Sequence, residues 1–541
     1  MAAQNSLPAL PLELWGSISS HLSNRDIKSL RLVCKQFSNA ASPHVQRVFL
    51  SANPLNIEVF RAIADHKMFR HRVTEIIWDD ARFIRGPRRN IHPAEEEDEL
   101  LSDEDENEIK NEDKQCPKWF KNACMKNLVE LRERNSHDVD RLDHIARAEQ
   151  IAAQPPLKKN WEYYQDLLRQ QEDVLVAKSD EDTFLYGLKQ FPALKRVTIT
   201  PAAHGHLFAP LYPTPMIRAL PKGFNYPIPR GWPITGEGRD PPLAYPWQEL
   251  NEAHKEKYRG FRIVTRVLAK EEHNVSELIL NANQLATGIN CTILDDPCAE
   301  YANLATVVKH PGLRRLDLAL LVGGIDNEEL NWQSFRNRRL HQALSKAKDM
   351  EDIMLYTTVI RDPSDDSTAE GGAGSLRHFI PLQSIFPIEK WSKLRHFELS
   401  RFLVAQSDVI SLLSVLPETF RSVHLSFLKF LDNCGSWYSF LAEIRKQICE
   451  NILWPDRDMV SRPKVTIGVS AFHTRARRGV WLEKEVHDYL YGEGEYPFYS
   501  DAPRSVKMGL GTERDTFEPN HDRPHDHRRA LIEKGFVKPI E

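Results

Sequence analysis

The hexapeptide LRRLDL, residues 313–318, decides how most of this chain folds. Apolar side chains stand at its first, fourth and sixth positions, which are Leu313, Leu316 and Leu318. The last two alternate with polar residues, which is the period of a strand that buries one face, and the first anchors the turn into that strand. We therefore expect a short strand here that packs two side chains into a core.

The same pattern, apolar-x-x-apolar-x-apolar, recurs along the middle of the chain. The other copies begin at Val73, Leu194, Val275, Met350, Leu394 and Phe420. Helix-compatible stretches lie between several copies, at residues 251–272, 297–309, 332–348 and 436–451. Because a strand that is followed by a helix and another strand implies a crossover connection, the pattern predicts parallel strands in a mixed fold, α/β or α+β.

Two architectures fit this pattern. One is an irregular repeat solenoid whose parallel strands line one face, and the other is an ordinary α/β domain. The copies resemble leucine-rich repeats, and Asn283 in LILNAN occupies the position of that family's asparagine. The copies start 26 to 121 residues apart, mostly farther than in regular repeats, and most of them have Leu, Phe or Thr in place of the asparagine.

A solenoid would expose the residues beside its strands on a concave face. We expect a protein substrate to meet this face together with the aromatic insert described below. The candidate substrate-binding residues are Asn281, Asn283, Tyr356, Arg401 and Phe427, with Ala319, Thr358, Ser400 and Ser426 beside them.

Composition divides the chain into three regions: a compact helical segment at 1–50, the repeat-like region at 51–470, and an irregular tail at 471–541. Within the middle region, residues 95–113 are densely acidic and predict a disordered loop. Residues 201–246 are rich in proline and aromatic residues, so we expect a long loop that packs on the body. The length of 541 residues corresponds to roughly three to four domains.

Charge and hydropathy exclude several classes of protein. The formal net charge is −4, so a broad nucleic-acid-binding surface is not expected. The longest apolar runs are far shorter than the roughly 18 residues of a membrane-spanning helix, and the N-terminus lacks the pattern of a secretory signal. Seven scattered cysteines form no CxxC pair, which favours a reducing compartment, either cytosol or nucleus.

The first fifty residues predict short amphipathic helices. Leu14, Ile18 and Leu22 share one helical face, and the Ser23–Asp26 segment has the form of a capping box that starts a second helix. In that helix an apolar stripe begins at Ile27, while Val33 lies off the stripe. This segment has more apolar surface than a pair of helices can hide, so the physics predicts a partner that covers the remainder.

The string LPALPLELWGSISSHLSNRDIKSLRLVCKQFSNAA, residues 7–41, resembles the F-box. It has the family's order of Leu-Pro, Glu-Leu, Ile, Leu, Asp-Ile and Leu-Arg-x-Val-Cys-Lys-x-Phe, with Ile27 where the family more often has Leu. The resemblance implies a three-helix unit that docks on the Skp-family adaptor of cullin–RING (SCF-type) ubiquitin ligases, while the rest of the chain selects a substrate. The residues expected to contact the adaptor are Leu10, Pro11, Leu14, Ile18, Leu22, Leu30 and Val33.

A substrate receptor of this kind needs no chemistry of its own, and the chain contains no GxxxxGK[ST], GxSxG or HExxH motif. We therefore expect no catalytic residues, no metal and no cofactor. Two alternatives stay open. One is a scaffold that binds the adaptor without promoting ubiquitination. The other is an enzyme within the middle region, which would show as a buried cluster of titratable groups in a pocket.

Overall fold

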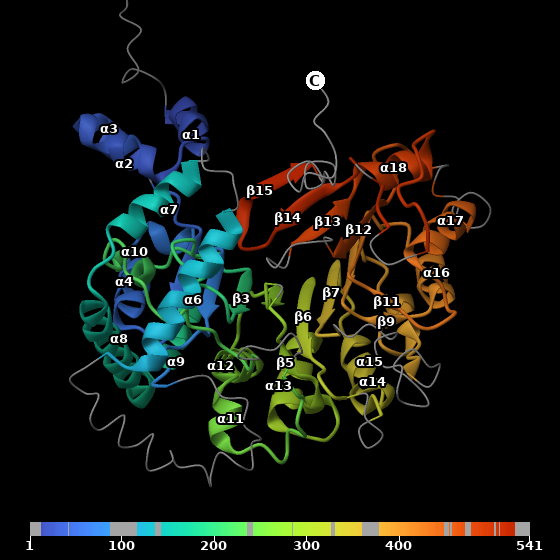
Figure 1. The fold of residues 1–541 in the computed structure, drawn as a ribbon, viewed down its shortest axis with the longest axis horizontal. Helices are drawn as coiled ribbons and strands as arrows, with labels where there is room; N and C mark the ends of the chain where they lie inside the picture. The colour runs from blue at the N-terminus through green and yellow to red at the C-terminus, as the bar shows by residue number, and fades with distance from the viewer. Residues whose placement is uncertain are drawn as a thin grey trace, which may run out of the picture.

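The computed structural model describes residues 12–41, 43–86, 116–135, 142–234, 242–283, 285–325, 331–359, 378–447, 454, 457–470, 478–501, 505–507 and 509–524. The acidic stretch 95–113 lies outside these residues. Within them, the chain forms one large sheet with helices around its margin (Figure 1).

Every copy of the hexapeptide pattern forms a strand, as predicted. These strands are β2 (Glu75–Asp79), β3 (Arg196–Thr200), β4 (Glu277–Leu280), β6 (Arg315–Leu321), β7 (Asp352–Thr357), β8 (His396–Ser400) and β10 (Ser422–Ser426). In the copy at 313–318, the three leucines are at most 2 % exposed. The anchoring residue and the two alternating side chains are buried in the other copies as well, so the period of the pattern predicted the buried face correctly.

Two strands that the pattern did not predict extend the sheet, β1 (Arg47–Leu50) and β12 (Lys464–Ser470), and the short β5 (Ile289–Asn290) pairs with β6. From β1 to β12 the strands lie in chain order, and every neighbouring pair is parallel. Parallel neighbours in chain order require crossover connections, and most of the connecting helices lie along the outer margin, on one face of the sheet (Figure 1). The parallel-strand prediction is confirmed.

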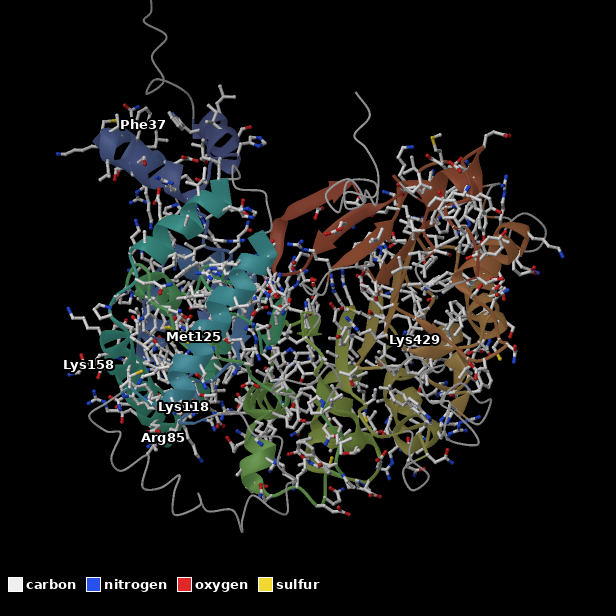
Figure 2. All side chains as sticks on the ribbon, in the orientation of Figure 1. Phe37, Arg85, Lys118, Met125, Lys158 and Lys429 are labelled. Carbon is white, nitrogen blue, oxygen red and sulfur yellow. The ribbon has the colours of Figure 1, made fainter. Side chains whose placement is uncertain are left out.

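The helices lie along the outer margin in Figure 1, and side chains fill the space between them and the strands in Figure 2. They are α4 (Pro54–Asp65), α8 (Leu157–Ala177), α9 (Ser179–Gln190), α11 (Glu252–Glu256), α12 (Arg259–Lys270), α13 (Ala299–Lys309), α14 (Gln333–Arg336), α15 (Arg339–Leu344), α16 (Gln406–Ser414) and α17 (Trp437–Gln447). Short 3₁₀ turns occur at Phe69–His71, Cys291–Leu294, Leu382–Ser384 and Ile388–Lys390, and β9 (Leu403–Val404) pairs with β11 (Lys429–Phe430). Helices form in each of the four stretches that the sequence marked as helix-compatible.

The proline-rich insert at 201–246 packs on the body, as its aromatic content predicts. Within its described residues, 201–234 and 242–246, the one helix is α10 (Pro215–Ala219). The side chains of Phe224, Tyr226 and Trp232 are at most 5 % exposed, and the Trp232 indole donates a hydrogen bond of 3.0 Å to the Asp80 carboxylate. Two further helices, α6 (Lys118–Asn135) and α7 (Leu142–Ala152), lie beside this insert.

The prediction of an irregular tail at 471–541 is wrong for its described part. This segment forms β13 (Gly479–Leu482), α18 (Lys484–Tyr491), β14 (Thr512–Asp515) and β15 (Glu518–Pro524), which continue the sheet in antiparallel pairs after β12. The tail is poor in apolar residues, but several of those it has lie in β13 and α18 and are buried. Val480, Leu482, Val486 and Leu490 are at most 2 % exposed.

The turn between β14 and β15 joins the last strands to helices from the first third of the chain. Arg134 at the end of α6 donates to the Asp515 carboxylate at 2.6 Å, and Arg147 on α7 donates to Glu518 at 3.1 Å. Arg478 donates to Asp515 at 3.2 Å from the other side. All five side chains are buried. We call these five residues the clasp, and Figure 1 shows β15 beside the end of α6.

Candidate protein-interaction sites

Three short helices stand at the N-terminal end: α1 (Leu12–Ser20), α2 (Asn24–Val33) and α3 (Lys35–Ala40). The predicted capping box is present, because the Ser23 hydroxyl accepts from the Asp26 N–H and the Asp26 carboxylate accepts from the Ser23 N–H, both at 3.2 Å. Trp15 and Phe37 meet edge to face with ring centroids 4.8 Å apart. Together with the fully buried Ile27, they form a small core among the three helices.

The same helices leave apolar side chains in solvent. Leu14 is 51 % exposed, Ile18 38 % and Val33 69 %, and their neighbour Leu32 is 89 % exposed. Leu22 and Leu30 are half-buried, while Leu10 and Pro11 lie outside the described residues. Exposed apolar side chains gathered on one small unit indicate a surface that a partner covers.

Polar contacts fix these helices to the start of the sheet. The Asn24 amide exchanges two hydrogen bonds with the His44 backbone, of 2.7 and 2.9 Å. The His44 ring contacts the Ser19 carbonyl at 2.8 Å. Because β1 begins at Arg47, this junction sets the direction of α1 and α2 relative to the sheet.

A second candidate site lies on the face of the sheet that the helices do not cover. A row of polar residues crosses the strands at their amino ends, one from each strand. In register, the row reads Arg47, Glu75, Arg196, Glu277, Arg315, Asp352, His396, Ser422 and Lys464. In the first half of the row, Arg47 donates to Glu75 and Arg196 to Glu277, each at 2.6 Å.

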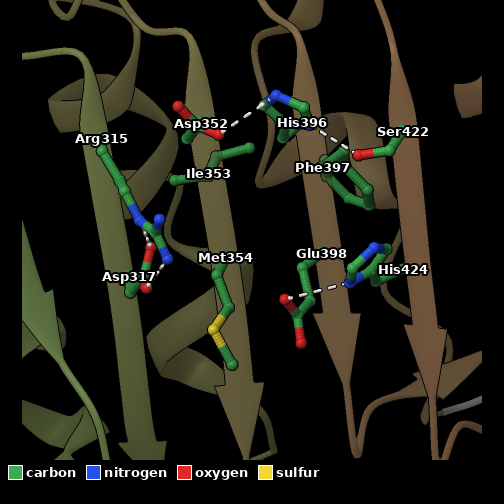
Figure 3. Close-up of a pocket in the computed structure, with 10 residues that line it drawn as sticks. All are labelled: Arg315, Asp317, Asp352, Ile353, Met354, His396, Phe397, Glu398, Ser422 and His424. Atoms are coloured by element: carbon green, nitrogen blue, oxygen red, sulfur yellow. Dashed lines mark hydrogen bonds and ion pairs between the residues drawn. The ribbon is translucent and has the colours of Figure 1, made fainter. Parts of the chain in front are cut away.

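In the second half of the row the charges are matched less well, and the surface forms a recess of about 280 Å³ (Figure 3). Arg315 pairs with Asp317 through two hydrogen bonds of 2.7 and 3.0 Å. The other two carboxylates face histidines at longer distances, with Asp352 3.9 Å from His396 and Glu398 3.8 Å from His424. Met354 lies between them as the apolar part of the lining.

Burial shifts the pKa values of three groups of the recess, Asp352, Glu398 and His424, toward the neutral form of each side chain. Desolvation, together with the nearby Asp317 charge, raises the pKa of Glu398 to about 7. Desolvation likewise raises the pKa of Asp352 and lowers the pKa of His424. The Glu398–His424 contact is therefore not a full ion pair near neutral pH. The recess offers a polar surface with weakly compensated carboxylates.

Ser422, His396 and Asp352 lie in the order of a hydrolase triad, but the geometry does not support that chemistry. The Ser422 hydroxyl contacts His396 at 2.6 Å, whereas the distance from His396 to Asp352 is too long for a hydrogen bond. The His396 side chain is 49 % exposed, and the Ser422 N–H is already donated to the Arg395 carbonyl at 3.0 Å. The arrangement lacks the oriented base that would activate a serine.

The predicted substrate-binding residues lie at the carboxyl ends of the strands, and several of them are not exposed as expected. Asn283 and Tyr356 are 6 and 4 % exposed, because the Asn283 amide donates to Thr200 and the Tyr356 hydroxyl donates to the Leu285 carbonyl. The neighbouring Ala319, Thr358, Ser400 and Ser426 are buried as well. Ala319 is packed in the core, and the polar groups of the other five make hydrogen bonds within the protein, so the expectation of exposure is wrong for all six.

Asn281, Arg401 and Phe427 remain half-buried, and the structure brings Tyr356, Arg401 and Phe427 together. The Arg401 guanidinium lies over the Phe427 ring at 5.0 Å and over the Tyr356 ring at 5.8 Å. Trp481 on β13 meets Phe427 edge to face at 5.8 Å. We call Tyr356, Arg401, Phe427 and Trp481 the stacked row.

Sequence reasoning missed the residues that line the recess. Asp352, His396, Glu398 and His424 occupy the polar positions of the strand pattern, so aligning the copies and examining those positions would have found them. Trp481 could not be found in this way, because it lies in a strand that the pattern does not mark.

Buried polar groups also occur beneath the insert. Burial raises the pKa of Asp79 to about 8 and lowers that of His204 to about 3, and the His204 ring contacts the Tyr226 hydroxyl at 2.8 Å. These groups help to hold the insert on the sheet. Within the part of the chain that the structure describes, no three His, Cys, Asp or Glu side chains gather as a metal site requires, and no helix has the length and hydropathy to span a membrane.

Comparison with known proteins identifies the first candidate site. Residues 7–44 match the family model of the F-box domain, which confirms the resemblance drawn from the sequence and covers α1, α2 and α3. No curated protein matches the chain.

Proposed function

The chain carries an F-box domain at residues 7–44, and we propose that it is the substrate-recognition subunit of an SCF-type ubiquitin ligase. In this proposal the F-box binds a Skp-family adaptor, which links the chain to a cullin–RING ligase. The observation that carries the proposal is the exposure of Leu14, Ile18 and Val33 on helices that also bury a core of their own. An adaptor surface would cover these side chains together with Leu10, Pro11, Leu22 and Leu30.

We propose further that the sheet is a leucine-rich-repeat-like solenoid and that a protein substrate binds its uncovered face. The in-order parallel strands and the helices on one side support this architecture. The recess and the exposed part of the stacked row are the features of that face that a substrate would contact. Asn281, Arg401 and Phe427 are accessible to it, whereas the buried Asn283 and Tyr356 support the surface from beneath.

In this function the chain supplies proximity and no catalytic residue, cofactor or metal, since the covalent chemistry belongs to the ubiquitin-conjugating enzyme. We propose that it works in the cytosol or nucleus, without nucleic-acid or membrane partners.

The test is a pull-down of the full chain with a Skp-family adaptor. The variant Leu14→Ala/Ile18→Ala/Val33→Ala should lose most of the binding, because truncating a buried anchor costs about 2 kcal/mol or more. The control is Val415→Ala, which truncates an apolar side chain of the body that is 51 % exposed. If wild type and the triple variant both fail to bind under conditions where a known F-box protein binds, the proposal is wrong. Adaptor binding without recruitment of the cullin would favour a scaffold over a ligase subunit.

A further inference from the structure

Arg401 is half-buried, and within the part of the chain that the structure describes no carboxylate pairs with its guanidinium. Its Nε is buried and has no hydrogen-bond partner among the described residues. Its guanidinium lies over the rings of Tyr356 and Phe427. A buried polar group without a partner is rare in native proteins, and an absent ion or ligand is one of the accepted explanations.

The backbone holds Arg401 and Phe427 in matching unusual conformations. Their φ angles are 52° and 54°, in the left-handed region that side chains other than glycine seldom adopt. The Arg401 N–H donates to the Ser426 carbonyl at 3.0 Å, and the Phe427 N–H donates to the Gly468 carbonyl at 2.8 Å. These bonds fix the backbone of both residues, and the contacts of the guanidinium with the two rings orient it before any ligand arrives. Such strain is concentrated at functional positions.

The surroundings of Arg401 favour a ligand with one negative charge over a ligand with two. Arg401 is the one cation of the stacked row, and a single guanidinium matches a carboxylate through two parallel hydrogen bonds. The weakly compensated carboxylates of the recess, Asp352 and Glu398, lie on β7 and on β8, the strand that Arg401 follows. Glu398 precedes Arg401 by three residues, roughly 10 Å along a strand, and its ionised fraction near neutral pH repels a dianionic phosphate more strongly than a singly charged carboxylate.

We propose that Arg401 binds the carboxylate of an acidic side chain in the protein substrate, with Tyr356 and Phe427 holding the guanidinium flat. The inference rests on the proposed substrate-receptor function and adds the chemical class that the uncovered face selects. A protein segment with an exposed Asp or Glu fits this site, and its neighbouring residues would lie over Phe427 and Trp481.

The experiment uses the full chain in complex with its adaptor and an immobilised peptide library. The central residue of the peptides is Glu, Gln, phosphoserine or Lys, and the flanking residues are random. Wild type should retain Glu-centred peptides roughly tenfold better than Gln-centred ones, as expected for a charge-assisted pair. Arg401→Gln should abolish this preference. Arg401→Lys should weaken it, because lysine lacks the planar fork.

The matched control is Arg395→Gln, which removes an arginine before the opposite end of β8 that is 59 % exposed. This variant should keep the Glu preference. Its loss in the control would show a general charge effect and would overturn the proposal. A preference for phosphoserine over Glu would overturn the choice of a carboxylate.

Three further measurements make the result decisive. Arg401→Gln should melt at the same temperature as wild type or higher, since it removes a half-buried charge that has no anionic partner among the described residues; a lower melting temperature would make Arg401 a structural residue. The same library is applied to a chain in which four acidic residues of the segment between β7 and β8 are neutralised, namely Asp362, Asp365, Asp366 and Glu370. If the Glu preference appears only in that chain, Arg401 is satisfied within the protein and the proposal fails. Adaptor binding of Arg401→Gln is measured in parallel, so a failure of the F-box function is distinguishable from a failure of this inference.

Discussion

The F-box helices and the sheet differ in how completely they bury their apolar side chains. The helices bury Trp15, Ile27 and Phe37 but leave Leu14 and Val33 largely in solvent. In the sheet, the apolar positions of every strand copy are buried against the outer helices. The difference shows that the body is stabilised by contacts within the chain, whereas the surface of the F-box is suited to be completed by another molecule.

The largest effect should come from truncating a buried side chain in the core of the body. Trp391 is fully buried, and its indole donates to the Leu344 carbonyl at 3.2 Å. Trp391→Ala should lower the free energy of unfolding by about 3–5 kcal/mol, because it leaves a cavity and an unpaired carbonyl. Urea unfolding measures this loss. For Val415→Ala the free energy of unfolding should stay within about 0.5 kcal/mol of wild type. An equal loss in the two variants would contradict the claim that buried contacts stabilise the body.

The clasp tests whether buried ion pairs between α6, α7 and the last strands also stabilise the body. Asp515→Ala leaves Arg134 and Arg478 buried without this carboxylate, so we expect a loss of about 3 kcal/mol. The variant should also make the segment after residue 500 more sensitive to limited proteolysis. The control is Asp522→Ala, whose carboxylate is 53 % exposed and 3.4 Å from Arg514 and whose removal should cost less than about 1 kcal/mol. Similar behaviour of the two variants would show that the clasp does not hold the ends together.

In the F-box, truncating an exposed side chain should weaken adaptor binding and leave the free energy of unfolding nearly unchanged. Val33→Ala should change the free energy of unfolding by no more than about 0.5 kcal/mol, because the side chain is 69 % exposed. The same variant should weaken adaptor binding by about 2 kcal/mol in a calorimetric titration. Phe37→Ala is the informative partner, since it removes a buried ring and should unfold the helices themselves. A destabilised Val33→Ala chain would mean that the body covers this face.

The sequence predicted the parts of the fold in which local pattern and burial coincide. The strand period at Leu316 and Leu318 and the capping box at Ser23 are local features, so each could be recognised without knowledge of distant contacts. The clasp could not be predicted, because Arg134 and Asp515 are 381 residues apart and neither lies in a distinctive motif. The exposure of Tyr356 was misjudged for the same reason, since the Leu285 carbonyl that binds its hydroxyl is 71 residues away in the sequence.

The smallest effect is a dependence on pH that arises from the recess. Burial raises the pKa of Glu398 from 4.5 to about 7, so the folded state holds this proton over a pH range in which the unfolded chain has lost it. The contribution of Glu398 to the free energy of unfolding should therefore be most favourable below about pH 4.5 and should fall as the pH rises to 7. Glu398→Gln should remove that slope and raise stability at pH 8 by about 1 kcal/mol, since solvent near the side chain reduces the full effect. Urea unfolding at pH 5 and pH 8 tests this, with Glu418→Gln as the control outside the recess. If Glu398→Gln is destabilised at pH 8, the carboxylate is stabilised in the recess by its neighbours, and the recess is better compensated than its distances indicate.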